Sequence, residues 1–195
     1  MTASDRPARI KFGTDGWRAL IADEFTFHNL ERVAQAYADF LLSELAMHTT
    51  YDASQHVAAH LAETLRVVVG YDRRFLSEQF ARRAAEVLSG NGLAVSLFAR
   101  DVPTPLVSWA VREGGAAGGV VITASHNPAH FNGFKIKAPW GGSATEQTTL
   151  AVEALVDAHA PRRATELPAS VHEGLGEATE SYRRQIGRAS CRERV

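Results

Sequence analysis

The stretch GVVITASHNP, residues 119–128, decides the fold of this chain. Its apolar first part, residues 119–122, is typical of a buried strand, and FKIK at residues 134–137 indicates a second strand. Between them, Ser125 and His126 lie beside a turn-forming Asn-Pro pair, on a loop at the end of a strand. Because α/β folds place their chemistry on such loops, the pattern predicts an α/β domain in which the Ser125 hydroxyl can carry a phosphoryl group.

Short apolar runs alternate with amphipathic segments along most of the chain. Thr26 and Ser77 are predicted helix N-caps. Apolar spacing predicts a strand broken by a loop within residues 10–21, strands at about 65–71 and 93–98, and helices at about 27–47, 78–89, 105–112 and 146–160. This alternation predicts a three-layer α/β/α domain with a mixed, mostly parallel sheet. The FKIK strand is the candidate for antiparallel pairing.

The composition changes toward the C-terminus. We expect the domain to occupy residues 1–160, followed by a linker and the start of a second domain at residues 161–186, where 180–186 can open a helix. Residues 187–195, GRASCRERV, hold three arginines and the single cysteine, without core-forming periodicity. We interpret this tail as artificial or frame-shifted sequence; the alternative is a natural polar C-terminus.

Composition limits the class of protein. The 195 residues are 45% apolar, enough for the core of one α/β domain. Lys plus Arg number 21 and Asp plus Glu 22, a balance that gives no reason to expect nucleic acid or an anionic membrane as partner. No apolar run could span a bilayer, the N-terminus lacks a signal-like segment, and one cysteine excludes an intramolecular disulfide. A cytoplasmic protein is expected.

Three segments resemble the α-D-phosphohexomutases, the family of phosphoglucomutase and phosphomannomutase. TASHNP at residues 123–128, followed by FNGFK at 131–135, resembles the family's phosphoserine loop. KFGTDGWR at 11–18 is similar to the N-terminal signature, and GYDRR at 70–74 to the G-x-D-x-R segment. The resemblance covers about residues 8–185. Family members have four domains, and this chain resembles only the first and the start of the second.

The resemblance implies catalytic roles for four residues. Ser125 would carry the phosphoryl group, and His126 would line the site around it. Lys135 and Arg18 would stabilise charge on the transferring group or move the proton of the sugar hydroxyl. Because arginine rarely loses its proton, Lys135 is favoured for the proton and Arg18 for the charge.

Further binding roles follow from the same resemblance. Arg74 and Asn127 would bind phosphate or substrate, and Arg74 could also support the phosphoserine loop. Mg²⁺ and hexose 1,6-bisphosphate are the implied cofactors. The family's metal loop, Asp-Gly-Asp-x-Asp-Arg, does not occur in this sequence. Phosphorylated Ser125 would therefore supply one metal ligand and the other ligands would be missing.

The implied function is phosphoryl transfer that interconverts hexose 1-phosphate and hexose 6-phosphate, of glucose or mannose, by a longer protein. This chain alone is expected to be inactive. Phosphoglucosamine mutase is the alternative within the family. Outside it, the alternatives are a serine hydrolase, although the G-x-S-x-G elbow is missing around Ser125, and a non-catalytic binding module. His56 and His60 could share a helix face as a zinc pair, but the sequence places no third ligand near them.

Overall fold

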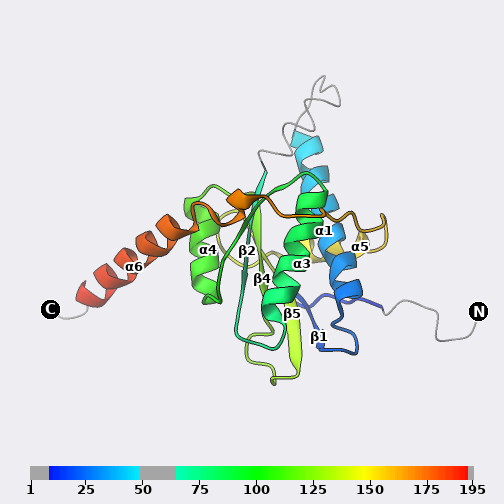
Figure 1. The fold of residues 1–195 in the computed structure, drawn as a ribbon, viewed down its shortest axis with the longest axis horizontal. Coiled ribbons are helices and arrows are strands. Elements are labelled where there is room, and N and C mark those ends of the chain that lie inside the picture. The colour runs from blue at the N-terminus through cyan, green and yellow to red at the C-terminus, as the bar shows by residue number, and fades with distance from the viewer. Residues whose placement is uncertain (1–8, 49–64, 193–195) are drawn as a thin grey trace, which may run out of the picture.

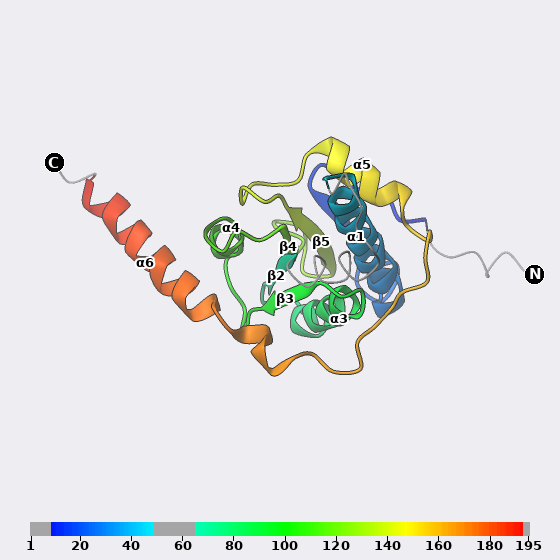
Figure 2. The ribbon, with the colours of Figure 1, turned by 90° about the horizontal axis from the view of Figure 1, so that it is seen from above.

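The computed structural model describes residues 9–48 and 65–192, in which five strands form one sheet with helices on both faces (Figures 1 and 2). The strands are β1 (Gly16–Leu20), β2 (Arg66–Tyr71), β3 (Ala94–Leu97), β4 (Gly118–Ile122) and β5 (Phe131–Lys137). The helices are α1 (Phe27–His48), α3 (Ser77–Gly90), α4 (Thr104–Glu113), α5 (Glu146–Ala154), the short 3₁₀ helix η2 (Ala169–His172) and α6 (Leu175–Arg192).

The sheet is mixed, as predicted, with the strand order β1-β5-β4-β2-β3. Strand β2 is parallel to both β3 and β4, whereas β5 is antiparallel to both β4 and β1. The antiparallel pairing of FKIK is thus confirmed. Among the described strands, parallel and antiparallel pairings are equally frequent, so the sheet is less parallel than expected. The reason is the short connection at residues 123–130, because a parallel neighbour requires a crossover of a dozen or more residues.

The two faces of the sheet bury separate cores, which confirms the three-layer architecture. Val67 and Val69 of β2 pack with the apolar faces of α1 and α3, whereas Val68 packs with α4. This division follows from strand geometry, since alternate side chains point to opposite faces. Figure 2 shows α4 on one side of the sheet and α1 and α3 on the other.

One predicted helix cap is confirmed and one is wrong. The Thr26 hydroxyl oxygen accepts a hydrogen bond from the Asn29 amide (3.2 Å) at the start of α1. Ser77, in contrast, is the first residue of α3, and Leu76 before it adopts the left-handed conformation with φ 60°. The Ser77 hydroxyl donates instead to Asp72 (2.9 Å), so its position reflects a tertiary contact.

The C-terminal elements differ in length from those expected. Helix α5 ends at Ala154 rather than near residue 160, and Asp157 beyond it has φ 71°, which helical backbone does not allow. Helix α6 begins at Leu175, before the predicted 180, and its backbone continues through Gly187 to Arg192. The proposed domain boundaries remain predictions. The polar connection expected after α1, with His56 and His60, lies outside the described residues.

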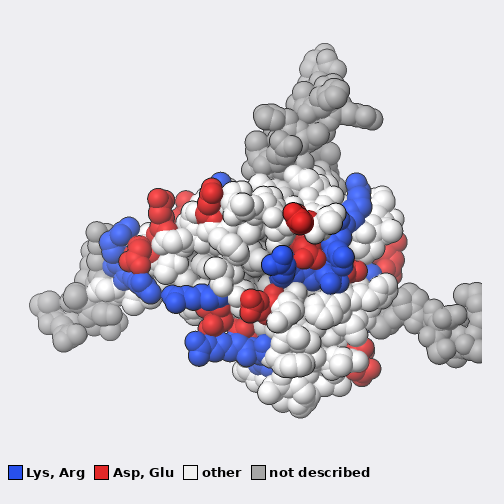
Figure 3. All heavy atoms as spheres, in the orientation of Figure 1, with Lys and Arg blue, Asp and Glu red and all other residues white. Residues whose placement is uncertain are grey.

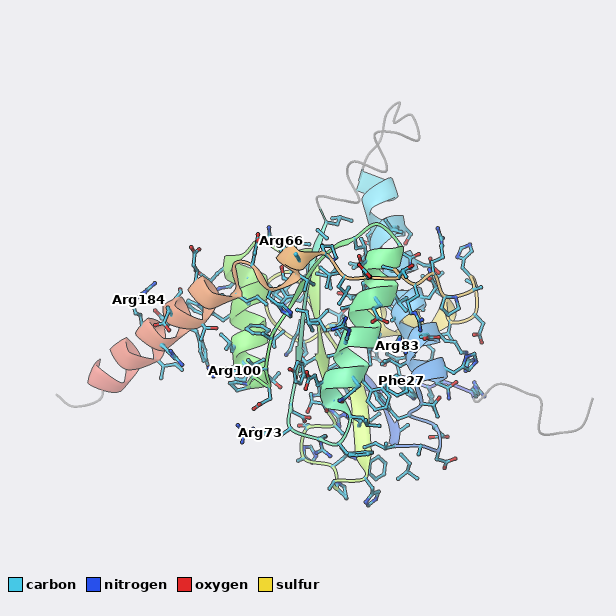
Figure 4. The ribbon with its side chains drawn as sticks, in the orientation of Figure 1. Phe27, Arg66, Arg73, Arg83, Arg100 and Arg184 are labelled. Atoms are coloured by element: carbon cyan, nitrogen blue, oxygen red, sulfur yellow. The ribbon has the colours of Figure 1, made fainter. Side chains whose placement is uncertain are left out.

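The segment expected as a linker packs on the domain. The amide of Ala164 donates to the Glu86 carbonyl (2.9 Å) and that of Arg162 to the Gln35 side chain (2.9 Å), so this segment crosses both α3 and α1. Beside it, the Arg83 guanidinium lies 5.0 Å from the Phe27 ring centroid (Figure 4).

The surface of the domain carries both positive and negative side chains, as Figure 3 shows for one face. Among the described helices, none combines the length and apolarity needed to cross a membrane.

An aromatic cluster between α3 and the N-terminal segment provides a test of the core. Phe80 is 1% exposed, and its ring lies 4.8 Å from that of Phe25 and 4.5 Å from that of Phe27. Phe80→Ala should lower the free energy of unfolding by about 3–5 kcal/mol, because it removes a buried ring and leaves a cavity. Phe75→Ala is the matched control, since Phe75 is 70% exposed, and should change stability by less than about 0.5 kcal/mol. Denaturant unfolding with equal losses in both variants would contradict this packing.

Candidate active site

Ser125 lies on the loop that leaves the carboxyl end of β4 and is exposed to solvent. Its backbone is in the left-handed region, with φ 57°, which costs a non-glycine residue about 1 kcal/mol. Two hydrogen bonds hold this turn: the Ser125 amide donates to the Thr123 hydroxyl (2.9 Å), and the Asn127 amide donates to the Ala124 carbonyl (3.1 Å). The loop therefore presents the serine side chain in a fixed, outward position.

Arg74 contacts the backbone of this loop. Its side chain is only 13% exposed, and its Nε lies 3.2 Å from the Asp72 carboxylate. The remaining N–H groups donate to four backbone carbonyls of the loop, those of Ser125 (2.8 Å), Asn127 (2.6 Å), Pro128 (2.7 Å) and Phe131 (3.1 Å). A guanidinium has five N–H groups, and these contacts engage all of them. The geometry favours the loop-supporting role predicted for Arg74 over its predicted role in substrate binding.

Asp72 connects the Arg74 contacts to the rest of the domain. It follows β2 directly, and one of its carboxylate oxygens accepts from the Arg74 amide (2.9 Å) and the Ser77 hydroxyl (2.9 Å). The other oxygen accepts from the Thr123 hydroxyl (2.5 Å). The GYDRR segment thus ties the carboxyl ends of β2 and β4 to the start of α3.

The two predicted cations come from neighbouring strands. In the antiparallel pair of β1 and β5, Arg18 lies opposite Gly133, two residues from Lys135. Trp17 and Phe134 point into the core beneath α1, so Arg18 and Lys135 project from the opposite face. Gly133 makes room for this arrangement, because an added Cβ would lie 2.9 Å from Cγ of Arg18. Sheet register therefore places both cations on one face.

Asp15 joins these two cations, and the sequence interpretation did not include it among the site residues. One carboxylate oxygen lies 3.0 Å from the Arg18 guanidinium, and the other accepts from the Lys135 ammonium at 2.7 Å. Burial alone would raise the pKa of Asp15, but Lys135, Arg18 and Lys137 outweigh it and hold this pKa below its usual value. The available signal was its position in the KFGTDGWR segment, three residues before Arg18.

Weaker contacts link these cations to the serine loop. Arg18 donates to the Asn127 side-chain oxygen at 3.5 Å, and the His126 ring nitrogen Nδ1 lies 3.4 Å from the Ser125 hydroxyl. Ser125, His126 and Asn127 thus share one loop, Arg18 contacts that loop through Asn127, and Lys135 is linked to Arg18 through Asp15. Arg74 is the sixth predicted site residue and lies under the loop.

The donors needed for a metal centre are sparse in this region. Within the described ranges, no group of three or more His, Cys, Asp and Glu side chains is arranged to hold a metal ion. The residues present therefore do not form a Mg²⁺ site by themselves, even with a phosphorylated Ser125 as one ligand.

The fold places this chain in the class of three-layer α/β/α domains. Its exposed serine and nearby cations suit the binding of an anionic substrate. Residues 42–163 match the family described as phosphoglucomutase/phosphomannomutase, alpha/beta/alpha domain I, and the chain belongs to this family. The family resemblance and the fold predicted from the sequence are both confirmed.

Individual relatives agree with the family. The chain is 42% identical over 133 residues to a Schizosaccharomyces pombe protein named "Probable phosphoribomutase", covering 68% of this chain and 20% of that protein. It is 37% identical over 123 residues to a Haemophilus influenzae "Probable phosphomannomutase", covering 58% and 25%. A solved structure from Thermus thermophilus, named as a phosphomannomutase, has 41% identity and a TM-score of 0.69, covering 82% and 33%. The chain thus spans a fifth to a third of the length of these relatives.

The Arg74 contacts predict how the serine loop responds to mutation. Arg74→Ala removes the donors to four loop carbonyls, so the amides of Ser125, Asn127 and Phe131 should exchange with deuterium at least about tenfold faster, equal to about 1.4 kcal/mol of local stability. Arg73→Ala is the adjacent control, because the Arg73 side chain is 86% exposed and lies at the periphery (Figure 4). Unchanged exchange in Arg74→Ala would show that the loop holds its shape without this side chain.

Proposed function

We propose that this chain is the phosphoserine-carrying first domain of a longer phosphohexomutase, with Ser125 as the phosphoryl carrier. The observation that supports the proposal is the chain of contacts from the serine loop to two cations: Arg18 donates to Asn127 beside the left-handed Ser125, and Asp15 joins Arg18 to Lys135. A dianionic phosphoryl group on Ser125 would face these cations. The complete protein would interconvert hexose 1-phosphate and hexose 6-phosphate, with glucose or mannose as the sugar.

The proposed chemistry divides one transfer into two. In the first half, the bond between phosphorus and Ser125 Oγ breaks while a bond forms to a free hydroxyl of the hexose phosphate, which becomes the 1,6-bisphosphate. As Ser125 Oγ leaves, the Lys135 ammonium would give it a proton and would take up the proton of the attacking sugar hydroxyl, so Lys135 ends in the protonation state in which it began. Arg18 would balance charge on the transferring group. In the second half Ser125 Oγ would attack the other phosphoryl group, and its hydroxyl proton would pass through Lys135 to the departing sugar oxygen.

Mg²⁺ belongs to the proposal only for the complete enzyme, where it would neutralise charge on the phosphoserine. Its remaining ligands would have to come from outside the described residues, since their side chains form no suitable group. Hexose 1,6-bisphosphate as activator and a cytoplasmic location also remain predictions from the sequence.

Alternative functions differ in what the site would have to contain. A serine hydrolase needs a base that a carboxylate orients. His126 lies beside Ser125, but no hydrogen bond or ion pair among the described residues gives His126 a carboxylate partner. Phosphoglucosamine mutase would use the same serine and cations and remains the alternative within the family. A non-catalytic binding module would keep the fold without phosphorylation of Ser125.

Phosphorylation of Ser125 is the direct test. When the complete enzyme is incubated with hexose 1,6-bisphosphate, mass spectrometry should find the phosphate on the peptide that contains Ser125. Ser125→Ala should abolish both the phosphopeptide and mutase turnover, because no carrier remains. Ser170→Ala, at an exposed serine of η2, is the control and should retain both. Phosphate found only at other residues, or full activity of Ser125→Ala, would refute the proposal.

The 195-residue chain by itself should fold but show no mutase turnover. Phosphoryl transfer depends on positioning and charge stabilisation, and the described residues supply no metal site. The assay is conversion of glucose 1-phosphate to glucose 6-phosphate with Mg²⁺ and a trace of the bisphosphate, on protein free of host mutase. Circular dichroism on the same sample establishes folding. Turnover like that of a complete mutase would mean that this domain contains far more of the active site than we propose.

A further inference from the structure

Asp15 occupies the position where an incoming anion would bind. Its two carboxylate oxygens contact the two cations separately, Arg18 at 3.0 Å and Lys135 at 2.7 Å. Both contacts are largely shielded, since the exposed fractions of the side chains are 18% for Asp15, 12% for Lys135 and 30% for Arg18. A phosphoryl group also presents several oxygens to such a pair of donors. The carboxylate therefore satisfies the same cations that a phosphate would use.

A third cation faces the same carboxylate. Lys137 follows Lys135 by two residues on β5, so its side chain leaves the same face of the sheet, and it is 8% exposed. Burial, and then the like charge of Lys135, lower the pKa of Lys137, while Asp15 opposes this shift. Three cationic side chains thus face one carboxylate, which leaves the cluster positive.

Solvent reaches this cluster. Lys11, Thr14, Asp15, Arg18 and Ser143 line an open groove of about 590 Å³ between the N-terminal loop and the turn after β5. On this face of the sheet, α4 packs over β2 and β4, and Figure 2 shows α4 beside these strands. A small anion can approach Asp15 and Arg18 without rearrangement of the described elements.

We propose that Asp15 is an internal counter-ion, which occupies the cations of the phosphoryl site and so weakens the binding of phosphate there. The inference rests on the proposed function and adds a property that this function does not require. A carboxylate between two cations opposes a second anion by direct repulsion and by competition for the same N–H groups. In the proposed reaction, a bisphosphate must leave the serine site before its other phosphoryl group can return. Weakened anion binding favours that release.

The experiment measures inorganic phosphate binding to the 195-residue chain by ³¹P NMR titration at low ionic strength. Asp15→Asn keeps the shape of the side chain and removes its charge, so phosphate should bind about tenfold tighter than to the unmodified chain. This gain in phosphate affinity should decrease as the salt concentration is raised. Lys135→Met should remove most of the binding in both backgrounds. Asp101→Asn is the control, since Asp101 also pairs with an arginine, Arg73, and the substitution changes the net charge equally.

A second readout follows the carboxylate itself. Phosphate should raise the pKa of Asp15, followed by ¹³C NMR of its carboxyl carbon, because the anion takes part of the cationic charge that holds this pKa low. Asp15→Asn that binds phosphate no tighter than the unmodified chain, or an equal gain in Asp101→Asn, would overturn the inference, as would no binding by any variant.

The two proposals can fail separately. If Ser125 is phosphorylated in the complete enzyme while Asp15→Asn gains no affinity, only the counter-ion is refuted. If Asp15→Asn gains affinity while Ser125 takes up no phosphate, the anion site stands and the phosphoserine function is refuted.

Discussion

The arrangement of the site depends on the contact between one buried guanidinium and the backbone of the serine loop. The loop joins two antiparallel strands, and four of its carbonyls accept from Arg74. Water would satisfy these carbonyls on the exposed loop if Arg74 were absent, but it would not hold them in one arrangement as a single guanidinium does. The same contacts offset the cost of the left-handed backbone at Ser125. Asp72 fixes the Arg74 guanidinium, so the position of the serine is ultimately set by the end of β2.

The antiparallel half of the sheet brings together residues that are far apart in the sequence. In a purely parallel sheet, the segment after β4 would return through a crossover helix packed on one face of the sheet. Here β5 turns back beside β4 and pairs with β1 on its other side, so residues far apart in sequence become neighbours. Asp15 and Lys135 are 120 residues apart and share an ion pair. Strand register therefore places Arg18 and Lys135 on one face of the sheet, and a groove lined by Asp15 and Arg18 is open to solvent.

Much of this fold was predictable, since the alternation of apolar runs with amphipathic segments, and the helical spacing of apolar residues, indicate which faces are buried. The strands β2 and β3, the long helix α1 and the cap at Thr26 follow from local pattern. Ser77 was misinterpreted because a serine before a helix has the same sequence signal whether it caps the backbone or binds a distant carboxylate. Asp15 was missed for a related reason: its two partners are fixed by the register of β1 against β5, which no local pattern specifies. Motif resemblance indicated the six candidate site residues, which stay predictions, but the contacts of Arg74 with the loop needed the loop geometry.

The charges of this domain balance one another within it. The described residues place several cations near the Ser125 loop, yet supply no set of metal ligands. Three clustered cations without a counter-charge would repel one another. A carboxylate on the N-terminal loop provides that counter-charge from within the domain. The same residue then opposes the substrate's phosphate, so the stability of the empty site and the strength of anion binding are linked through one side chain.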